Sequence, residues 1–294
     1  MMTSQPPGPW TLRFWGVRGS IAVPGPGTVR YGGNTSCAVL EAAGYSALVL
    51  DAGTGLREYG RAVRDLPASD LDLVLTHTHW DHIQGLPFFG PLYQPAGRLR
   101  LYGPRQEAGL RRVLERLTAR ENFPIPAAAW AGLSALVELD EGEFEAGGWQ
   151  VRATRLCHPG HTLGFRLSRP GVAPVAYLTD NELAGGAHDV SSGWRDNLVD
   201  FLGGVRTLVH DTTWSEEQLG PHQGWGHSSP REAVLLAAEA GCRRLVMFHH
   251  HPEHDDATVD QLLDRAREDA HRLAGGLAVD AAMEGLALTL DQEA

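Results

Sequence analysis

The most concentrated chemical signal in the chain is a run of imidazole and carboxylate groups at residues 77–82. The run reads His-Thr-His-Trp-Asp-His, so four groups that can bind a metal fall within six residues. In an extended segment, side chains two residues apart point to the same side, about 6.6 Å apart, so His77 and His79 can share one ion. Asp81 and His82 follow where a turn can direct them to a second ion. This donor set favours Zn²⁺, with Mn²⁺ or Fe as alternatives.

Other candidate ligands end apolar segments later in the chain. Asp180 closes the apolar run YLTD, and three consecutive histidines follow the apolar run RLVMF. Because side chains alternate along a strand, His249 and His251 should face away from His250. We expect His250 and His254 to lie on the surface or behind the metal ligands.

A candidate anion site precedes a predicted helix. Ser229 has the properties of an N-cap, Pro230 stands at the first helical position, and Glu232 completes a capping box. His227 therefore lies near the positive end of a helix, where an anion is stabilised. We expect His227, oriented by a hydrogen bond to Asp211, to act as a general acid or to stabilise charge on a phosphate.

The glycine-rich start of the chain offers a second phosphate site. Arg18, Gly19 and the run 32–35 could present a guanidinium and backbone N–H groups to a phosphate. An array of glycine turns without a ligand explains the same residues equally well.

The elements that position these groups alternate between short apolar runs and amphipathic stretches. Strands are predicted at 11–15, 37–41, 47–51, 71–76, 99–102, 149–156, 164–168, 175–179, 207–210, 244–248, 276–280 and 286–290. Helical periodicity occurs at 110–117 and 259–273. The alternation predicts one α/β domain over residues 1–294, with helices covering the sheets. The stretch 91–133 is either a lid over the site or an ordinary helical insertion.

Composition limits the partners and the compartment. The chain has 294 residues and a net charge of −11, and all 25 basic side chains are Arg, scattered along the sequence. An extended nucleic acid is therefore an unfavourable partner. The three cysteines are widely and irregularly spaced, which indicates a reducing cytoplasm. No signal peptide or membrane span is evident. A homodimer is compatible with these features.

The histidine run matches the HxHxDH motif of the metallo-β-lactamase fold superfamily, and the likeness covers nearly the whole chain. Residues 48–53 resemble the strand that precedes this motif. The order of the later segments resembles the ribonuclease Z and phosphodiesterase branch: His158-Pro159-Gly160, Thr179-Asp180, His210-Asp211-Thr212, Gly226-His227-Ser228 and Phe248-His249. The opening FWGVRGSIAVPGPGTVRYGGNTSC resembles a bacterial group of metal-dependent hydrolases. The resemblance implies a four-layer αββα sandwich with two metals at the sheet edges.

The resemblance also implies roles for individual residues. The first ion would be held by His77, His79 and a later histidine, which is His158 in the ribonuclease Z pattern and His161 in the lactamase and glyoxalase pattern GHTxG. We favour His158. The second ion would be held by Asp81, His82 and His249, and Asp180 would bridge the two ions. Asp81 would also take part in catalysis.

The catalytic pair departs from the family pattern at one position. In the segment HDTT, Asp211 stands where ribonuclease Z-like enzymes have Glu in HEAT. Two divalent ions would activate a bridging water near neutral pH and polarise the substrate. We therefore expect a phosphodiesterase acting on a small or cyclic-nucleotide phosphodiester. The alternatives are a ribonuclease Z-like endonuclease, a thioester or lactone hydrolase, and a silent metal-binding scaffold.

Overall fold

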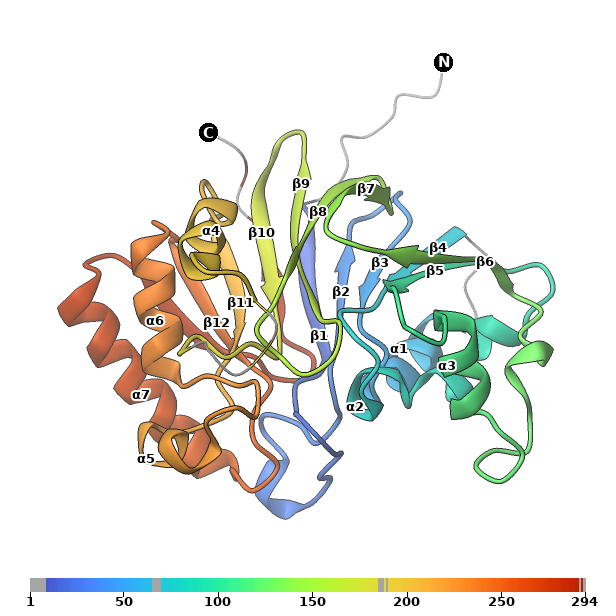
Figure 1. Ribbon diagram of the computed structural model, residues 1–294, viewed down its shortest axis with the longest axis horizontal. Helices are drawn as coiled ribbons and strands as arrows, with labels where there is room; N and C mark the ends of the chain where they lie inside the picture. The colour runs from blue at the N-terminus through green and yellow to red at the C-terminus, as the bar shows by residue number, and fades with distance from the viewer. Residues whose placement is uncertain (1–8, 65–69, 185–187, 189, 291, 293–294) are drawn as a thin grey trace.

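Two seven-stranded mixed sheets lie face to face at the centre of the molecule, and helices cover the outer face of each sheet (Figure 1). The computed structural model describes residues 9–64, 70–184, 188, 190–290 and 292. This arrangement confirms the four-layer αββα sandwich. No helix within the described ranges is both long and apolar enough to cross a lipid bilayer.

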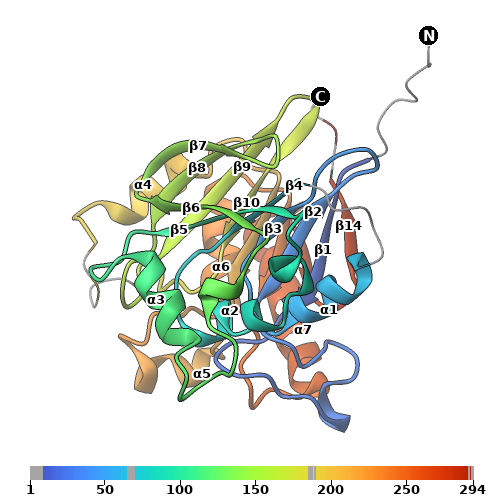
Figure 2. The same cartoon turned by 90° about the vertical axis from the view of Figure 1, so that its right-hand side faces the viewer.

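The first sheet has the strand order β14-β1-β2-β3-β4-β5-β6. Strands β3 to β6 run parallel to one another, and β14, β1 and β2 pair in antiparallel fashion. Its strands are β1 (Thr11–Gly16), β2 (Cys37–Glu41), β3 (Leu48–Leu50), β4 (Asp70–Val74), β5 (Arg98–Pro104), β6 (Leu133–Leu139) and β14 (Ala287–Thr289). Its helices are α1 (Gly55–Val63), α2 (Trp80–Ile83) and α3 (Leu110–Leu117); they lie on the same side of the molecule (Figure 2).

The second sheet has the order β13-β12-β11-β10-β9-β8-β7. Strands β10 to β13 are parallel, and β7 to β10 are antiparallel. Its strands are β7 (Gly142–Ala146), β8 (Trp149–Arg155), β9 (Leu163–Arg169), β10 (Val172–Leu178), β11 (Thr207–Asp211), β12 (Arg244–Phe248) and β13 (Ala278–Ala281). Its helices are α4 (Trp194–Phe201), the short α5 (Glu216–Leu219), α6 (Pro230–Glu239) and α7 (Asp256–Leu273).

The inner strands are apolar on both faces because each sheet is covered on both sides. In β12, Val246 and Phe248 point into the core between the sheets, while Leu245 and Met247 pack under the helices. The alternation follows from the two-residue period of a strand. The helix predicted from the capping box is α6, and the Ser229 side chain accepts a hydrogen bond from the Glu232 N–H as expected.

The structure adds three features to the sequence expectations. The runs at 276–280 and 286–290 are close in sequence, but they form β13 and β14 in different sheets. Strands β6 and β7 were not predicted. The segment 91–133 contains β5, an inner strand of the first sheet that corresponds to the strand predicted at 99–102, so residues 91–97 and the crossover between β5 and β6 lie outside the sheet.

Candidate dinuclear metal centre

A cluster of three imidazoles forms where two strands of different sheets end. His77 and His79 follow β4, and His158 follows β8. The Nε2 atom of His158 lies 3.1 Å from Nδ1 of His79, and one ring nitrogen from each histidine lies within 4.8 Å of the others. The buried Nε2 of His77 has no hydrogen-bond partner among the described residues. Such an orphaned nitrogen is expected to bind a group that the protein itself does not provide.

Local hydrogen bonds fix which nitrogens are free. Nδ1 of His158 lies 2.8 Å from the carbonyl oxygen of Gly226, so it must carry the proton, which leaves the lone pair on Nε2. Burial lowers the pKa of His77 well below its ordinary value and that of His158 to about 3. Both rings are therefore neutral at pH 7, which is the form of imidazole that binds metals.

A second cluster joins two imidazoles and two carboxylates. Nε2 of His249 lies 3.1 Å from Oδ2 of Asp81, and Nε2 of His82 lies 3.3 Å from the same oxygen. The donor atoms of Asp81, His82, Asp180 and His249 all lie within 4.8 Å of one another, and all four residues are buried.

Asp180, directly after β10, connects the two clusters. Its Oδ2 lies 3.6 Å from Nε2 of His77 and 3.7 Å from Nε2 of His158. Its Oδ1 lies 3.1 Å from Nε2 of His82 and 3.2 Å from Nε2 of His249. Burial alone would raise the pKa of Asp180, but the surrounding imidazoles hold this pKa well below its usual range, and His249 has the largest effect among them. One carboxylate oxygen thus faces each cluster, as a bridging ligand requires.

The donor set fits two divalent cations. Three imidazoles with a shared carboxylate at one position, and two imidazoles with two carboxylates at the other, are the ligands that zinc and related metals take. The structure brings together all the residues predicted as ligands: His77, His79, Asp81, His82, His158, Asp180 and His249. His161 lies elsewhere, in the field of Arg155 and Asp140. Of the two alternatives, His158 is the one that lies beside the other predicted ligands.

A second layer of residues holds the ligands in place. The fully buried Asp51, which follows β3, has Oδ2 2.9 Å from Nδ1 of His82 and accepts hydrogen bonds from the N–H and hydroxyl of Thr76. The hydroxyl of Thr213 lies 3.0 Å from Nδ1 of His249. Such partners orient a metal-binding ring and fix its protonation.

No role was predicted for Asp51 or Thr213 from the sequence. Asp51 had a usable signal, because it ends the apolar run LVLD as Asp180 ends YLTD. Thr213 follows a strand without any comparable pattern.

Backbone strain is concentrated at this centre. Among the described residues, four that are not glycine have positive φ: Ser20 at 63°, Asp51 at 61°, Asp180 at 51° and His249 at 62°. Asp180 and His249 belong to the clusters, Asp51 contacts His82, and the N–H of Ser20 donates to Oδ2 of Asp81 at 2.7 Å. Each such residue costs about 1–3 kcal/mol, and such strain is typical of functional sites.

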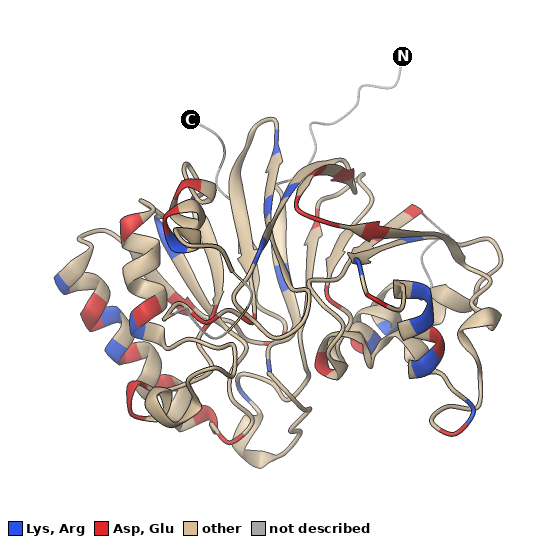
Figure 3. Cartoon of the chain, viewed as in Figure 1, with Lys and Arg blue, Asp and Glu red and all other residues tan. Residues whose placement is uncertain are grey.

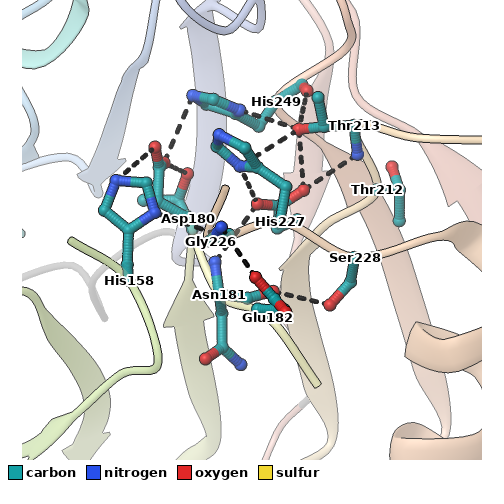
Figure 4. Close-up of polar contacts among 12 residues, drawn as sticks. His158, Asp180, Asn181, Glu182, Thr212, Thr213, Gly226, His227, Ser228 and His249 are labelled. Carbon is teal, nitrogen blue, oxygen red and sulfur yellow. Dashed lines mark hydrogen bonds and ion pairs between the residues drawn. The ribbon is translucent and has the colours of Figure 1, made fainter. Parts of the chain in front are cut away.

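A histidine–aspartate pair, His227 and Asp211, borders the second cluster. Figure 4 shows His227 beside His249. Nδ1 of His227 lies 2.6 Å from Oδ2 of Asp211, and the His227 ring stacks against His249 with ring centroids 5.1 Å apart. Asp211 is fully buried and also accepts hydrogen bonds from the N–H and hydroxyl of Thr213. Burial alone would lower the pKa of His227, but Asp211 raises it to about 9. The pair therefore places an imidazole that favours its protonated form at the edge of the site.

The loop that carries His227 is fixed by a buried acid. Both carboxylate oxygens of Glu182 accept hydrogen bonds from the N–H of Gly224, and one of them also accepts from the N–H of Gly226. Because Gly226 also contacts His158, this loop links the His227 side of the site to the first cluster.

The two clusters of candidate metal ligands open into a pocket of about 470 Å³. The residues lining it are Ser20, Thr78, His79, Trp80, Asp81, His158, Asp180, His227 and His249. Ligands from both clusters and His227 therefore face the same space, where a substrate atom could contact all of them.

The glycine-rich start of the chain does not provide the phosphate site that one interpretation proposed. Arg18 is fully buried, and its guanidinium donates to the carbonyl oxygens of Gly32, His251 and His254. Its donors point into the protein, so Arg18 joins two loops and is not accessible to a ligand in the pocket.

The histidines after β12 match one of the two alternatives expected for them. His250 and His254 are buried, so the surface alternative is wrong and a position behind the ligands stays open. Nε2 of His250 lies 2.9 Å from the carbonyl oxygen of Ala282, and Nε2 of His254 lies 3.1 Å from Oε1 of Gln218. The positive φ of His249 interrupts the strand geometry, so simple alternation does not describe this segment.

Comparison with known proteins supports the family suggested by the HxHxDH motif. A family model described as "Beta-lactamase superfamily domain" matches residues 47–250. Ribonuclease Z of Bacillus cereus is 25% identical over 243 residues, which cover 67% of this chain and 75% of that protein.

Two solved structures share the fold. The metallo-β-lactamase fold protein YhfI of Bacillus subtilis aligns with a TM-score of 0.69 and 19% identity, covering 96% of this chain and 99% of that one. A diphosphatase of the PhnP family aligns with a TM-score of 0.65 and 20% identity, covering 96% and 98%. The chain belongs to the metallo-β-lactamase superfamily, and its buried His and Asp clusters place it among the metal-dependent hydrolases of that superfamily.

Proposed function

We propose that this protein is a dinuclear metal-dependent phosphodiesterase that acts on a small phosphodiester, cyclic nucleotides included. The observation that carries the proposal is the His227–Asp211 pair beside the two clusters. A phosphodiester needs a nucleophile, charge stabilisation on the phosphoryl oxygens, and a proton for the leaving oxygen. The clusters account for the first two requirements and His227 for the third.

The chain's own residues have separate tasks in this reaction. The seven ligands would hold two divalent cations, which when bound activate water at neutral pH and polarise a phosphoryl oxygen. Asp180 sets the spacing of the two positions, because each of its oxygens contacts a different cluster.

Asp211 orients the proton donor. It holds Nδ1 of His227, so Nε2 is the ring nitrogen left to donate a proton to the leaving oxygen. The N-terminus of α6, which begins at Pro230, adds positive potential on the same side of the site. His227 would thus serve as the general acid.

Charge favours a small substrate over a polynucleotide. The net charge is −11, and arginines are spread over both helical layers instead of forming one basic stripe (Figure 3). A polynucleotide gains most of its affinity from many phosphate contacts, which this distribution does not favour. A ribonuclease is the second candidate, supported by the likeness to ribonuclease Z of Bacillus cereus.

The experiment is a substrate panel on the metal-loaded protein, with His227→Ala compared against His271→Ala, an exposed histidine in α7. The panel contains bis(p-nitrophenyl) phosphate, cyclic nucleotides, a structured RNA, a thioester, a lactone and a β-lactam. We expect phosphodiester turnover, and a loss of about 10² to 10⁴ in kcat for His227→Ala with both metals retained. Adding Asp211→Ala should cost little more, because the two residues act as one unit.

Two results would contradict the proposal. One is parental phosphodiesterase activity in metal-loaded His227→Ala. The other is a parent protein that hydrolyses the thioester, the lactone or the β-lactam far better than any phosphodiester. A strong preference for the RNA would favour the second candidate.

A further inference from the structure

A second open pocket, of about 820 Å³, adjoins the metal pocket. The two pockets share Thr78 and Trp80 as lining residues. One wall comes from α2 and the turn at Leu86–Phe88, and the other from α3 and the loop that follows it, to Phe123. Both helices lie on the same side of the first sheet (Figure 2). A molecule bound at the metal clusters can therefore extend into this second space.

Aromatic side chains dominate the exposed wall. Trp80 is 78% exposed and Phe88 is 56% exposed, although both are large apolar groups. The rings of Phe88 and Phe123 meet edge to face, with centroids 5.3 Å apart and an interplanar angle of 81°. Exposed rings gathered around one cavity favour a planar ligand, because a flat ring can bury its face against them.

Polar groups stand among the aromatic ones. Arg116, Glu121 and Asn122 line the same pocket and offer both hydrogen-bond donors and acceptors. Arg116 has no ion-pair partner among the residues that the structure describes. A nucleobase combines a flat face with donors and acceptors on its edge, so its chemistry matches both parts of the wall.

We infer that this second pocket binds the nucleobase of a nucleotide phosphodiester whose phosphate lies at the metal clusters. The inference rests on the proposed function and specifies its substrate class. Trp80 lies between the ligands His79 and Asp81 in the chain, so a base held against it keeps the phosphate close to the reacting centre. Binding energy from the base would then orient the scissile bond.

The test measures binding, not turnover. Adenosine 5′-monophosphate and ribose 5-phosphate are titrated into the metal-loaded protein by calorimetry; they differ only in the base. We expect the nucleotide to bind more tightly. Phe88→Ala and Phe123→Ala should each weaken it by about 5- to 150-fold, the range for losing one stacking ring, and leave ribose 5-phosphate unchanged.

Ile125→Ala is the matched control, because Ile125 is 43% exposed in the same loop but does not line the pocket. It should bind both compounds as the parent does. Phe88→Leu keeps apolar bulk without a flat ring and should weaken nucleotide binding in the same way, which separates stacking from an effect on folding.

Three results would overturn the inference. The first is equal binding of the two compounds by the parent. The second is an equal loss of affinity for both compounds in the phenylalanine variants. The third is unchanged affinity for both compounds in these variants together with a change in their sedimentation, which would make this face a contact between copies of the chain. Because the titration needs no turnover, a base preference without phosphodiesterase activity would reject the proposed function and leave the pocket assignment standing.

Discussion

Gly19 offers a direct test of the second metal position, because it lies against the ring of His249. A Cβ added at Gly19 would lie 2.3 Å from Cε1 of that ring, 2.4 Å from Nδ1 and 2.9 Å from Nε2. Ordinary contacts begin near 3.4 Å, so in Gly19→Ala the ring would have to move by about 1 Å. The substitution therefore displaces a predicted ligand without removing its nitrogens.

His249 has little freedom to accommodate this displacement. Nδ1 is held at 3.0 Å by the Thr213 hydroxyl, Nε2 lies 3.1 Å from Asp81, and the backbone φ is already 62°. Metal–ligand distances vary by only about 0.2 Å, so a shift of about 1 Å moves Nε2 beyond the distance at which it could bind the second ion. We expect the affinity for the second ion to fall by at least about 10- to 100-fold. This is the typical loss when a residue that orients a metal ligand is mutated.

The assay is elemental analysis of the folded protein after dialysis against graded chelator. Gly19→Ala should release one ion at a lower chelator concentration than the parent and keep the other. Gly25→Ala is the control, since nothing lies within 4 Å of a Cβ at that position and its φ is 175°. If Gly19→Ala holds two ions with parental affinity, the placement of His249 as a ligand is refuted.

Three further predictions use other parts of the structure. His158→Ala should lower the affinity for the first ion strongly, whereas His161→Ala should leave it unchanged in the same chelator assay; the reverse order would support the GHTxG alignment. Asp180→Ala should lose at least one ion, and unchanged metal content would remove Asp180 from the bridging position. Ser229→Ala removes the N-cap of α6 and should lower the free energy of unfolding by about 1 kcal/mol, measured by urea titration; no change would mean that the cap contributes nothing.

Much of the architecture could be predicted because the inner strands are short apolar runs bounded by polar residues. The run at 244–248 and the capping box at Ser229 each correspond to an element of the structure. Strand β6 escaped prediction because its residues alternate only weakly between partly buried and exposed positions. Strand β7 reads Gly-Glu-Phe-Glu-Ala and has too few apolar residues to stand out. The helix α1 begins at Gly55 and contains a further glycine, Gly60, in its interior, which weakens its helical pattern.

Contacts between ligands that are close in sequence were predicted better than contacts between ligands that are far apart in sequence. His77 to His82 are adjacent in sequence, so their spacing alone suggests shared metals. The contact between Asp81 and His249 joins residues 168 positions apart, and family resemblance rather than spacing pointed to it. The role of Thr213 depends on which side chains meet after folding, and no local pattern encodes it, whereas Asp51 ends an apolar run as Asp180 does. Arg18 illustrates the converse, because its motif suggested a ligand site and its burial excludes one.

We propose that two metal ions at these clusters support hydrolysis of a phosphodiester, and a metal titration of the metal-free protein is the sharpest test of this proposal. Zn²⁺ is added stepwise while bound metal and the hydrolysis of bis(p-nitrophenyl) phosphate are measured on the same samples. The rate should rise with occupancy and reach its plateau at about two ions per chain, and Asp180→Ala should not reach the parental rate at any metal concentration. A plateau at one ion, or a fully loaded protein without phosphodiesterase activity, would rule out a dinuclear phosphodiesterase.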